Sequence, residues 1–384
     1  MKRVTMIDCF SIIQDPRLDR TRKHELIDIL VLAVCGVICG CDNWVEIAQF
    51  GESKKAWFKS FLRLSNGIPS HDTFARVFSL IDSSALQKGF YSWVRENFDV
   101  QNDVIAIDGK YIKSSHGSTT KKKRSIFGMV NAWSTKAGVA LAQLRTDFDK
   151  KNEKTVFSNL IEILYLEGSI VTLDANGCHA RIANEILDKK GDYFFALKNN
   201  QKSLFKQAES LLDDLNQEAG SYSSTVDKDH GRIERRTCVA VNLSDDFKIN
   251  LAKKNKQKQQ MCWKQLTSIC KVTSERTIKG QAKTEVRYYI SSIEADANRM
   301  LSLSRGHWEV ENKLHWVLDV AFNEDQSRSR KGFSGENLAV LRQIALNLLN
   351  TEQSSKKSIA VKRKQCGWEN SYLAKVLAAA SQQE

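Results

Sequence analysis

The sequence predicts an α/β protein in which helices flank a mixed sheet and an all-helical region comes first. Residues 1–97 show the spacing of apolar side chains by three and four that is typical of helices. From residue 103 the pattern changes to short apolar runs of strand length. One of them, residues 104–107, is uniformly apolar, which indicates a strand buried on both faces of a sheet.

The all-helical region is predicted to begin with a loop around Asp15-Pro16-Arg17. Helices are expected at about residues 24–40, 44–50 and 54–62, after Ser70 as N-cap, and at 84–97. The apolar run 26–41 contains Asp28 and is shorter than the ~20 residues that a membrane-spanning helix needs. A buried core helix is therefore expected there.

Two interpretations remain open for the helix that follows Ser70. It could be the second helix of a DNA-binding helix-turn-helix. In that case three polar side chains would be offered to DNA: His71, Thr73 and Arg76. Alternatively, it is an ordinary bundle helix, buried through three apolar residues: Phe74, Val77 and Phe78.

The elements between residues 104 and 197 are predicted to follow the order β-β-β-α-β-α-β. Strands are expected at 104–107, 126–133, 139–146, 169–173 and 193–197, and helices at 155–167 and 179–190. This order is the RNase H-like arrangement, in which the end of the fourth strand lies beside the first.

A mostly β insertion is predicted at about residues 215–293. A helix at 201–213 precedes it, and strands are expected at 231–241, 267–273 and 284–293. Between them the basic run 253–258 is expected to form a flexible loop, and a second basic loop is expected at 114–124.

Three domains are therefore expected. They are a helical, DNA-binding N-terminal domain at 1–97, an RNase H-like domain with the insertion at 98–350, and a peripheral basic tail at 351–384.

The composition favours a polyanionic partner. Among 384 residues, 58 Lys and Arg face 45 Asp and Glu, which gives a formal net charge of +13. Nucleic acid is expected before an anionic membrane. The nine cysteines form no Cys-x-x-Cys pair, so neither a zinc ribbon nor a thioredoxin-type site is indicated. Together with the lack of a visible secretory signal, this fits a reducing cytoplasm.

Three acidic residues stand where they could converge. Asp108 ends the first strand and Asp174 ends the fourth, and a glycine follows each within three residues. Glu311 lies on a long helix predicted at 302–322, where it shares one face with His307 and His315. Converging carboxylates bind Mg²⁺ or Mn²⁺, because hard cations prefer oxygen ligands. A pair of such ions supports in-line displacement at phosphorus without a protein nucleophile.

Glu309 is the competing choice for the third acid. Two residues turn an α-helix by about 200°, so Glu309 and Glu311 point in nearly opposite directions. The face of Glu311 also carries Leu318 and Phe322 and is suited to packing on a core, whereas the side of Glu309 is more polar. Glu311 is therefore the predicted third acid.

Several motifs resemble those of the DDE transposases of bacterial insertion sequences. They are Ala106-Ile-Asp108-Gly-Lys110, Thr172-Leu-Asp174-Ala-Asn-Gly-Cys178, Ala196-Leu-Lys198-Asn-Asn-Gln201, and His307-Trp-Glu-Val-Glu311-Asn-Lys-Leu-His315-Trp-Val-Leu-Asp319-Val with Asn323-Glu-Asp325. From about residue 8 to 350 the chain more narrowly resembles the H-repeat-associated branch, including Asp15-Pro-Arg17 and Gly67-Ile-Pro-Ser-His-Asp-Thr-Phe74.

The resemblance implies a function. Asp108, Asp174 and Glu311 would be the catalytic triad and would bind two Mg²⁺ or Mn²⁺ ions. The reaction would be cleavage and transfer of DNA strands at the ends of an insertion sequence. The partners would be double-stranded DNA, from the element ends and from the target, and a second copy of the chain in the active complex.

The sequence departs from the pattern of the related enzymes at a few positions. Residues 176–179 read Asn-Gly-Cys-His where the branch usually has Met-Gly-Cys-Gln, which changes no predicted ligand. Neighbouring branches carry a tyrosine, an arginine and a lysine around the glutamate. These places are taken here by Ser304, His307 and Leu318.

Basic and imidazole side chains near the acids or in the first basic loop are the predicted DNA contacts: Lys110, Lys121, Lys122, Lys123, Arg124, Arg305, His307 and His315. Lys110 lies two residues beyond Asp108 on the same side of its strand. It is expected to contact a phosphate near the scissile bond or, alternatively, to face the solvent.

Three other functions compete with a transposase. His307, Glu311 and His315 could form a zinc site, although they lack the His-Glu-x-x-His order. The chain could also be a transposase-derived DNA-binding protein that has lost catalysis. An RNase H-like nuclease would share the metal chemistry but would hydrolyse DNA without joining strands.

Overall fold

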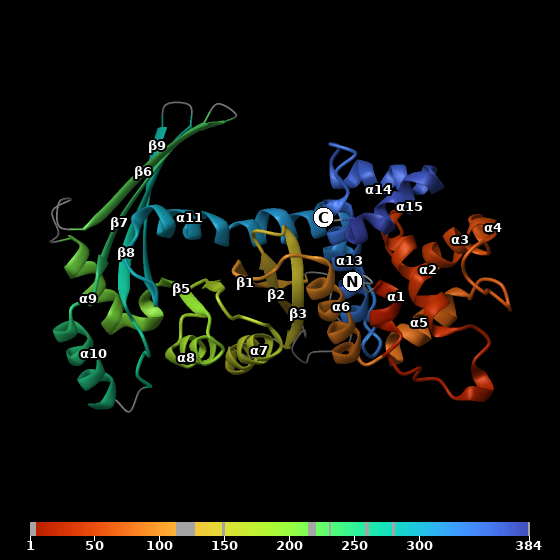
Figure 1. The fold of residues 1–384 in the computed structure, drawn as a ribbon, viewed down its shortest axis with the longest axis horizontal. Coiled ribbons are helices and arrows are strands. Elements are labelled where there is room, and N and C mark those ends of the chain that lie inside the picture. Colours follow the sequence, from red (N-terminus) through yellow and green to blue (C-terminus); the bar gives the residue numbers. More distant parts are fainter. Residues whose placement is uncertain are drawn as a thin grey trace, which may run out of the picture. The chain divides into compact units, whose positions relative to one another are not determined.

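A computed structural model describes residues 5–112, 127–147, 150–213, 220–229, 232–257, 261–278 and 281–382 (Figure 1). Its sheet contains nine strands in the order β3-β2-β1-β4-β5-β9-β8-β7-β6. The strands are β1 Val104–Tyr111, β2 Phe127–Ser134, β3 Val139–Asp147, β4 Ile170–Leu173, β5 Asp192–Leu197, β6 Ser221–Asp229, β7 Arg232–Asn242, β8 Ser268–Ile278 and β9 Gln281–Ser291.

Helices flank this sheet and form most of the rest of the described chain. They are α1 Met6–Phe10, α2 Leu26–Ile38, α3 Trp44–Ser53, α4 Lys55–Phe58, α5 His71–Leu80, α6 Ser83–Asn97, α7 Lys150–Ile163, α8 Ala180–Asp188, α9 Lys202–Asp213, α10 Asp245–Gln257, α11 Ala297–His307, η4 Val310–His315, α12 Trp316–Phe322, α13 Ser334–Thr351, α14 Ile359–Trp368 and α15 Asn370–Ala378.

The sheet is mixed, as predicted. β4 runs parallel to β1 and to β5, whereas β2 and β3 pair antiparallel. The order of β3, β2, β1, β4 and β5 is that of the RNase H-like arrangement, so the predicted fold class is confirmed. The four strands of the insertion are all antiparallel, and β9 joins them to β5.

By its contacts the chain divides into two compact units. The first comprises residues 1–100, 109–156 and 312–384, and the second comprises residues 101–108 and 157–311. This division does not follow the three domains expected from the sequence. In particular, Lys362 and Arg363 of the predicted peripheral tail are buried in the first unit.

Helix α13 is the core of the first unit. It packs against α2, α5, α6 and β3, and nearly all of its side chains are buried. Two of its buried amides bond to other elements. Asn347 accepts from the backbone N–H of Ala140 at 2.8 Å and donates to the carbonyl oxygen of that residue at 2.9 Å. Asn337 donates to the carbonyl oxygens of Phe78 and Ile81. These bonds fix α13 to β3 and to the end of α5.

Helix α5 is buried in the way that the bundle interpretation requires. Phe74, Val77 and Phe78 are completely buried, and the ring of Phe78 stacks on Trp44 with centroids 4.6 Å apart. His71 and Arg76 are exposed on the other side. DNA contact through these two side chains stays a prediction.

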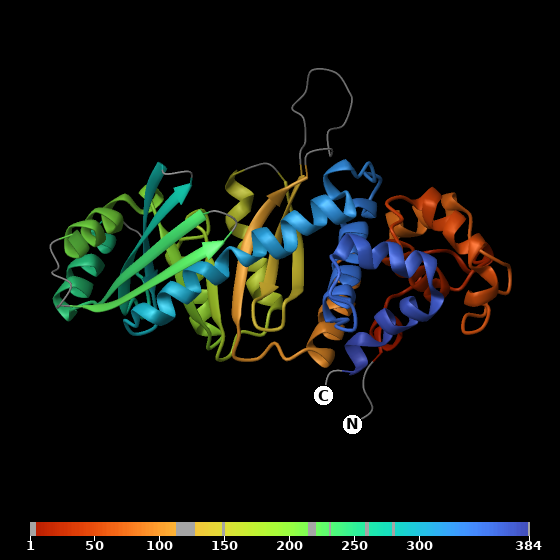
Figure 2. The same cartoon turned by 90° about the horizontal axis from the view of Figure 1, so that it is seen from above.

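In the second unit, helices cover both faces of the sheet. Figures 1 and 2 show α8 and α11 on opposite sides of β4 and β5. Helix α11 packs on the insertion through Ala297, Met300 and Leu301, which share a core with Cys238 and Cys270. Phe194 of β5 stacks on Tyr289 of β9 with centroids 4.6 Å apart. The insertion is thus part of the core of this unit.

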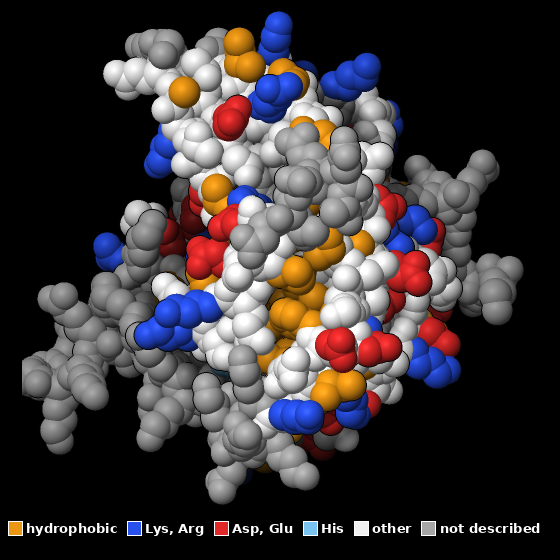
Figure 3. All heavy atoms as spheres, turned by 90° about the vertical axis from the view of Figure 1, so that its left-hand side faces the viewer, with side chains coloured by type: hydrophobic (Ala, Val, Ile, Leu, Met, Phe, Trp, Pro, Cys, Tyr) orange, Lys and Arg blue, Asp and Glu red, His pale blue; other side chains and the backbone are white. Residues whose placement is uncertain are grey.

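The outer end of the insertion has a mixed surface. Figure 3 shows a band of apolar side chains there, with both Lys or Arg and Asp or Glu around it. The exposed large apolar residues of the insertion include Tyr222, Val226, Ile233, Ile249, Met261 and Val286. Because both signs of charge occur, this face is not a uniformly basic surface.

Three local predictions were wrong. Residues 253–257 are the end of α10 and not a flexible loop. Strand β6 was not predicted, because its run Ser-Tyr-Ser-Ser-Thr-Val has few apolar residues. It adopts the strand conformation through its pairing with β7. The long helix 302–322 is not continuous, because the π-helical turn η4 separates α11 from α12. The predicted basic loop 114–124 lies outside the described residues.

Within the described part of the chain, no helix is both long enough and apolar enough to cross a membrane. Helix α2, which covers most of the apolar run 26–41, has 13 residues and is buried almost throughout.

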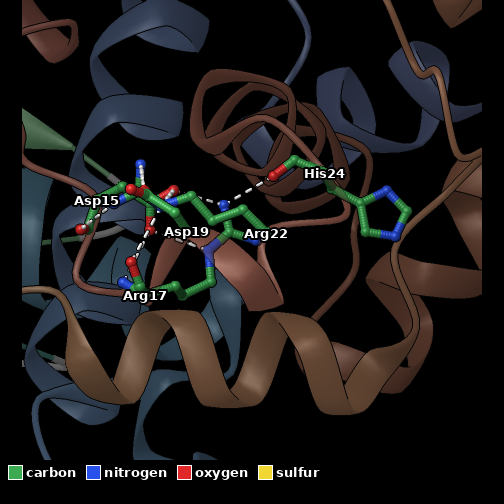
Figure 4. Close-up of polar contacts among 5 residues, drawn as sticks. All are labelled: Asp15, Arg17, Asp19, Arg22 and His24. Carbon is green, nitrogen blue, oxygen red and sulfur yellow. Dashed lines mark hydrogen bonds and ion pairs between the residues drawn. The ribbon is translucent and has the colours of Figure 1, made fainter.

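The loop around Asp15-Pro16-Arg17 is closed by charged side chains (Figure 4). Arg17 donates to both carboxylate oxygens of Asp15 at 2.9 and 2.6 Å and to the carbonyl oxygen of His24 at 2.7 Å. Arg22 donates to the carbonyl oxygen of Arg17 at 3.0 Å. Burial by itself would raise the pKa of Asp15, but hydrogen bonds and charge from Arg17 outweigh it and lower the pKa. This motif therefore has a structural role.

We predict that Asp15→Asn lowers the free energy of unfolding by about 2 kcal/mol at pH 7, because hydrogen bonds to a charged group are lost. A folded pKa below the ordinary value of about 3.9 stabilises the fold above that pH, and the contribution disappears as the pH falls through the folded pKa. When urea unfolding is measured from pH 7 to pH 3, the difference in free energy of unfolding between the wild type and the variant should therefore become smaller. An equal deficit at all pH values would contradict this explanation, and Asp19→Asn, on an exposed carboxylate, is the control.

Candidate active site

Two of the predicted acids follow the last paired residues of the parallel strands β1 and β4. Asp108 was predicted to end its strand, but β1 continues to Tyr111. The register of β1 and β4 pairs Ala106 with Thr172 and Ile107 with Leu173. Asp108 and Asp174 are the residues that follow this last pair. They are therefore neighbours, because adjacent strands lie about 4.8 Å apart. Ligands of open α/β sheets bind outside the carboxyl ends of the strands, which is where these two carboxylates lie.

A tight turn holds Asp174. Its Oδ1 accepts hydrogen bonds from the backbone N–H groups of Asn176 at 3.0 Å and of Gly177 at 3.2 Å. A Cβ atom at Gly177 would lie 3.0 Å from the side chain of Leu173, which would have to move by a few tenths of an ångström to admit it. Burial raises the pKa of Asp174, although these bonds and the charge of Lys198 partly offset the effect.

Glu311 lies in the π-helical turn η4 and interacts electrostatically with Asp174. Burial raises the pKa of Glu311, the charge of Arg287 lowers it and the charge of Asp174 raises it. π-helical turns inside α-helices are rare and occur frequently at functional sites. Asp174 and Glu311 are thus like charges in one partly buried region.

Arg287 of β9 is the fixed cation beside Glu311. Its Nε donates to Oε1 of Glu285 at 2.8 Å, and its guanidinium stacks over the ring of Trp308 at 4.4 Å from the centroid. Trp308 lies three residues before Glu311 on the same helical segment. The strand of the insertion therefore supplies a positive charge beside Glu311.

The three carboxylates fit a hard divalent cation by their chemistry, since all their donor atoms are oxygen. Among the residues with described positions, no three His, Cys, Asp or Glu side chains are close enough to hold a metal ion.

His307 contacts the strand that carries Asp174. Its Nδ1 lies 3.0 Å from Oγ1 of Thr172. Burial, together with the charge of Arg287, lowers the pKa of His307 to about 4, so the ring is neutral at pH 7. The contact with Thr172 links the end of α11 to β4. DNA contact by His307 stays a prediction.

His315 and Lys110, two further predicted DNA contacts, are buried in the first unit. Nε2 of His315 lies 3.2 Å from the amide nitrogen of Asn131. Oδ1 of the same Asn131 accepts a hydrogen bond from Nε2 of Gln343 at 2.7 Å. Lys110 pairs with two carboxylates of α12 and the turn after it. The alternative of a solvent-facing Lys110 is therefore wrong.

The remaining predicted DNA contacts are divided between the surface and the undescribed loop. Arg305 is half-exposed and lies 3.1 Å from Asp227. Lys121, Lys122, Lys123 and Arg124 lie outside the described residues. The zinc-site alternative lacks support, because the ring nitrogens of His307 and His315 contact Thr172 and Asn131 instead.

Three residues of the site were not predicted from the sequence: Arg287, Lys198 and Thr172. Lys198 directly follows β5, the third parallel strand. Its place in the motif Ala196-Leu-Lys198-Asn-Asn-Gln201 could have marked it. Thr172 is the one polar residue in β4, which could have marked it. Arg287 gave no local signal, because it lies on an insertion strand 24 residues before Glu311.

Comparison with known proteins agrees with this geometry. Residues 100–348 match the family model described as "Transposase DDE domain", and residues 7–94 match the model described as "DDE_Tnp_1-associated". "Putative transposase YncI" of Escherichia coli O157:H7 is 38% identical, over 98% of this chain and 95% of that protein. "H repeat-associated putative transposase YhhI" of Escherichia coli strain K12 is 36% identical, over 98% of this chain and 99% of that protein. "Inactive transposase YbfQ" of the same strain is 40% identical, over 21% of this chain and 94% of that protein. The chain therefore belongs to the family of transposases with a DDE domain.

Proposed function

We propose that this protein is a DNA transposase that cleaves and transfers DNA strands at the ends of an insertion sequence with Mg²⁺ or Mn²⁺ as cofactor. The observation that carries the proposal is the register of β1 and β4, which makes Asp108 and Asp174 neighbours at the carboxyl edge of the sheet. The electrostatic interaction of Asp174 with Glu311 supports the third member. The family supports the reaction class.

In this proposal Asp108, Asp174 and Glu311 hold the divalent ions. When bound, a pair of such ions activates an oxygen nucleophile and stabilises the leaving 3′ oxygen during in-line displacement. The turn at residues 174–177 fixes one oxygen of Asp174 and so directs the other. Arg287, held by Glu285 and Trp308, limits the negative charge around Glu311 before a cation arrives.

Double-stranded DNA from the element ends and from the target is the proposed substrate. The net charge of +13 favours it, and Lys198 is an exposed cation at the end of β5, next to the acids. A homodimer would allow the two ends of an element to be processed together. All nine cysteines are free thiols, which is compatible with the proposed reducing, cytoplasmic location.

Two other functions remain as alternatives. A transposase-derived DNA-binding protein without catalysis is one, and a relative that carries the name "Inactive transposase" gives it weight. A nuclease of the same fold is the other. An assay with labelled element-end DNA and a target plasmid separates all three: joined products support a transposase, nicks alone support a nuclease, and binding without products supports the inactive protein.

We expect Asp108→Asn and Asp174→Asn to abolish cleavage while the fold survives. The amide keeps the shape of the side chain and much of its hydrogen bonding but removes the charge that holds the metal. A bound metal supplies several kcal/mol of transition-state stabilisation. Loss of a metal ligand should therefore reduce the rate of strand cleavage at least about 100-fold. Full activity of Asp174→Asn, measured with Mg²⁺ on a donor-end substrate, would remove Asp174 from the site.

The choice between Glu309 and Glu311 is tested by a pair of matched variants. Glu311→Gln should lose metal-dependent cleavage, whereas Glu309→Gln should retain it, because only Glu311 is assigned to the metal. Both proteins are compared at equal folded fraction by circular dichroism. The reverse result would assign Glu309 as the third acid.

DNA affinity should fall steeply with salt. A protein that neutralises six or more phosphates loses roughly 10³-fold in affinity between 50 and 200 mM salt. Fluorescence anisotropy with a labelled duplex measures the slope. An affinity that hardly changes over this range would contradict extensive phosphate contact.

A further inference from the structure

The ammonium group of Lys110 is surrounded by acceptors from one short stretch of chain. Nζ lies 2.5 Å from Oδ1 of Asp319 and 2.7 Å from Oε2 of Glu324, and it also faces the carbonyl oxygen of His315 at 3.5 Å. Lys110 and Glu324 are almost completely buried. A lysine ammonium has three N–H donors, and each faces an acceptor of the protein here. A phosphate contact would have to displace one of these partners.

The two ends of this interaction lie next to the proposed metal ligands in the sequence. Lys110 is two residues beyond Asp108 on β1, and alternate residues of a strand point to the same face. His315 is the last residue of η4, the turn that contains Glu311, and Asp319 follows one helical turn later. One cation therefore joins the strand end that carries Asp108 to the helical segment that carries Glu311.

A second buried cation balances the two carboxylates. Arg342 of α13 is completely buried and interacts electrostatically with Glu324 and Asp319. A buried ion network of this kind is costly to desolvate and is not needed to fill a core. The network instead fixes the relative position of the segments that it joins. Charge-assisted hydrogen bonds have a more specific geometry than a contact between apolar side chains.

We propose that Lys110 is a positioning residue: its contacts with His315, Asp319 and Glu324 hold the end of β1, and with it Asp108, in a fixed place relative to the helix of Glu311. The inference rests on the proposed function, since the placement matters because both carboxylates bind the same pair of ions. Lys110 itself contacts neither metal nor DNA.

The test measures metal binding directly. Mn²⁺ binding to the full chain without DNA is followed by the loss of the free-ion electron paramagnetic resonance signal, and cleavage of donor-end DNA is measured in parallel. Lys110→Met keeps the length of the side chain and removes the charge. It should weaken Mn²⁺ binding by about 10- to 100-fold, the loss typical of residues that orient metal ligands, and should reduce cleavage with it.

Lys362→Met is the matched control. Lys362 of α14 is buried to a similar degree, donates to the carbonyl oxygen of Leu349 at 2.9 Å and pairs with Glu352. Its partners belong to the end of α13 and the segment that follows, not to the metal-binding elements. This variant should lose stability but keep the Mn²⁺ affinity of the wild type.

The double variant Lys110→Met/Glu324→Gln separates positioning from mere stability. It removes the buried charge that Lys110→Met alone leaves without its ammonium partner, so thermal stability should recover while Mn²⁺ affinity stays low. Asp319→Asn, on a partly exposed side chain, serves if Lys110→Met fails to fold and should weaken Mn²⁺ binding in the same direction.

Each result decides between the two proposals. Wild-type Mn²⁺ affinity in Lys110→Met, or recovery of affinity together with stability in the double variant, overturns the positioning role. Intact Mn²⁺ affinity with weaker DNA binding would point to the phosphate contact instead and would equally overturn it. A wild-type protein that binds Mn²⁺ but neither cleaves nor joins DNA contradicts the proposed function alone, and one that binds no Mn²⁺ contradicts both.

Discussion

The parallel register of β1 and β4 is the constraint on which the site depends. Because Ile107 is level with Leu173, the next residue on each strand is an aspartate at the same edge of the sheet. The apolar residues before them, at 105–107 and 170–173, are buried. The pairing of these two buried stretches thus sets the two aspartates side by side.

Bringing these charges together is unfavourable without a cation, and the surroundings offset part of the cost. The N–H groups of the turn after Asp174 and the cations Lys198 and Arg287 all act on the carboxylates. They do not cancel burial, which still raises the pKa of both Asp174 and Glu311. In the proposed function, a divalent ion would supply the positive charge that these carboxylates still lack.

The two histidines beside Glu311 contact strands of the sheet in the structure. His307 contacts Thr172 of β4, and His315 contacts Asn131 of β2. Glu311 itself lies in the π-helical turn between them, and its choice over Glu309 stays a prediction. None of the three acids is among the buried side chains that form the core. Catalysis could therefore be lost while the structure is kept, which is why the fold alone does not establish activity.

The sequence by itself determined the RNase H-like order of the elements from β1 to β5 and the helical nature of residues 1–97, because each depends on a local pattern of apolar side chains. It placed Asp108 at the end of its strand, whereas β1 continues to Tyr111. It did not determine β6, whose residues are too polar to indicate a strand before β7 pairs with them. It also failed for residues 253–257, where a basic run proved to be helical. The partners of Lys110 and Arg287 were decided only by the tertiary structure: Lys110 meets Glu324 across 214 residues, and the guanidinium of Arg287 reaches Trp308 from another strand. Local patterns report which side chains are buried, but an ion pair between distant segments depends on where the packed core brings them, and no local pattern contains that information.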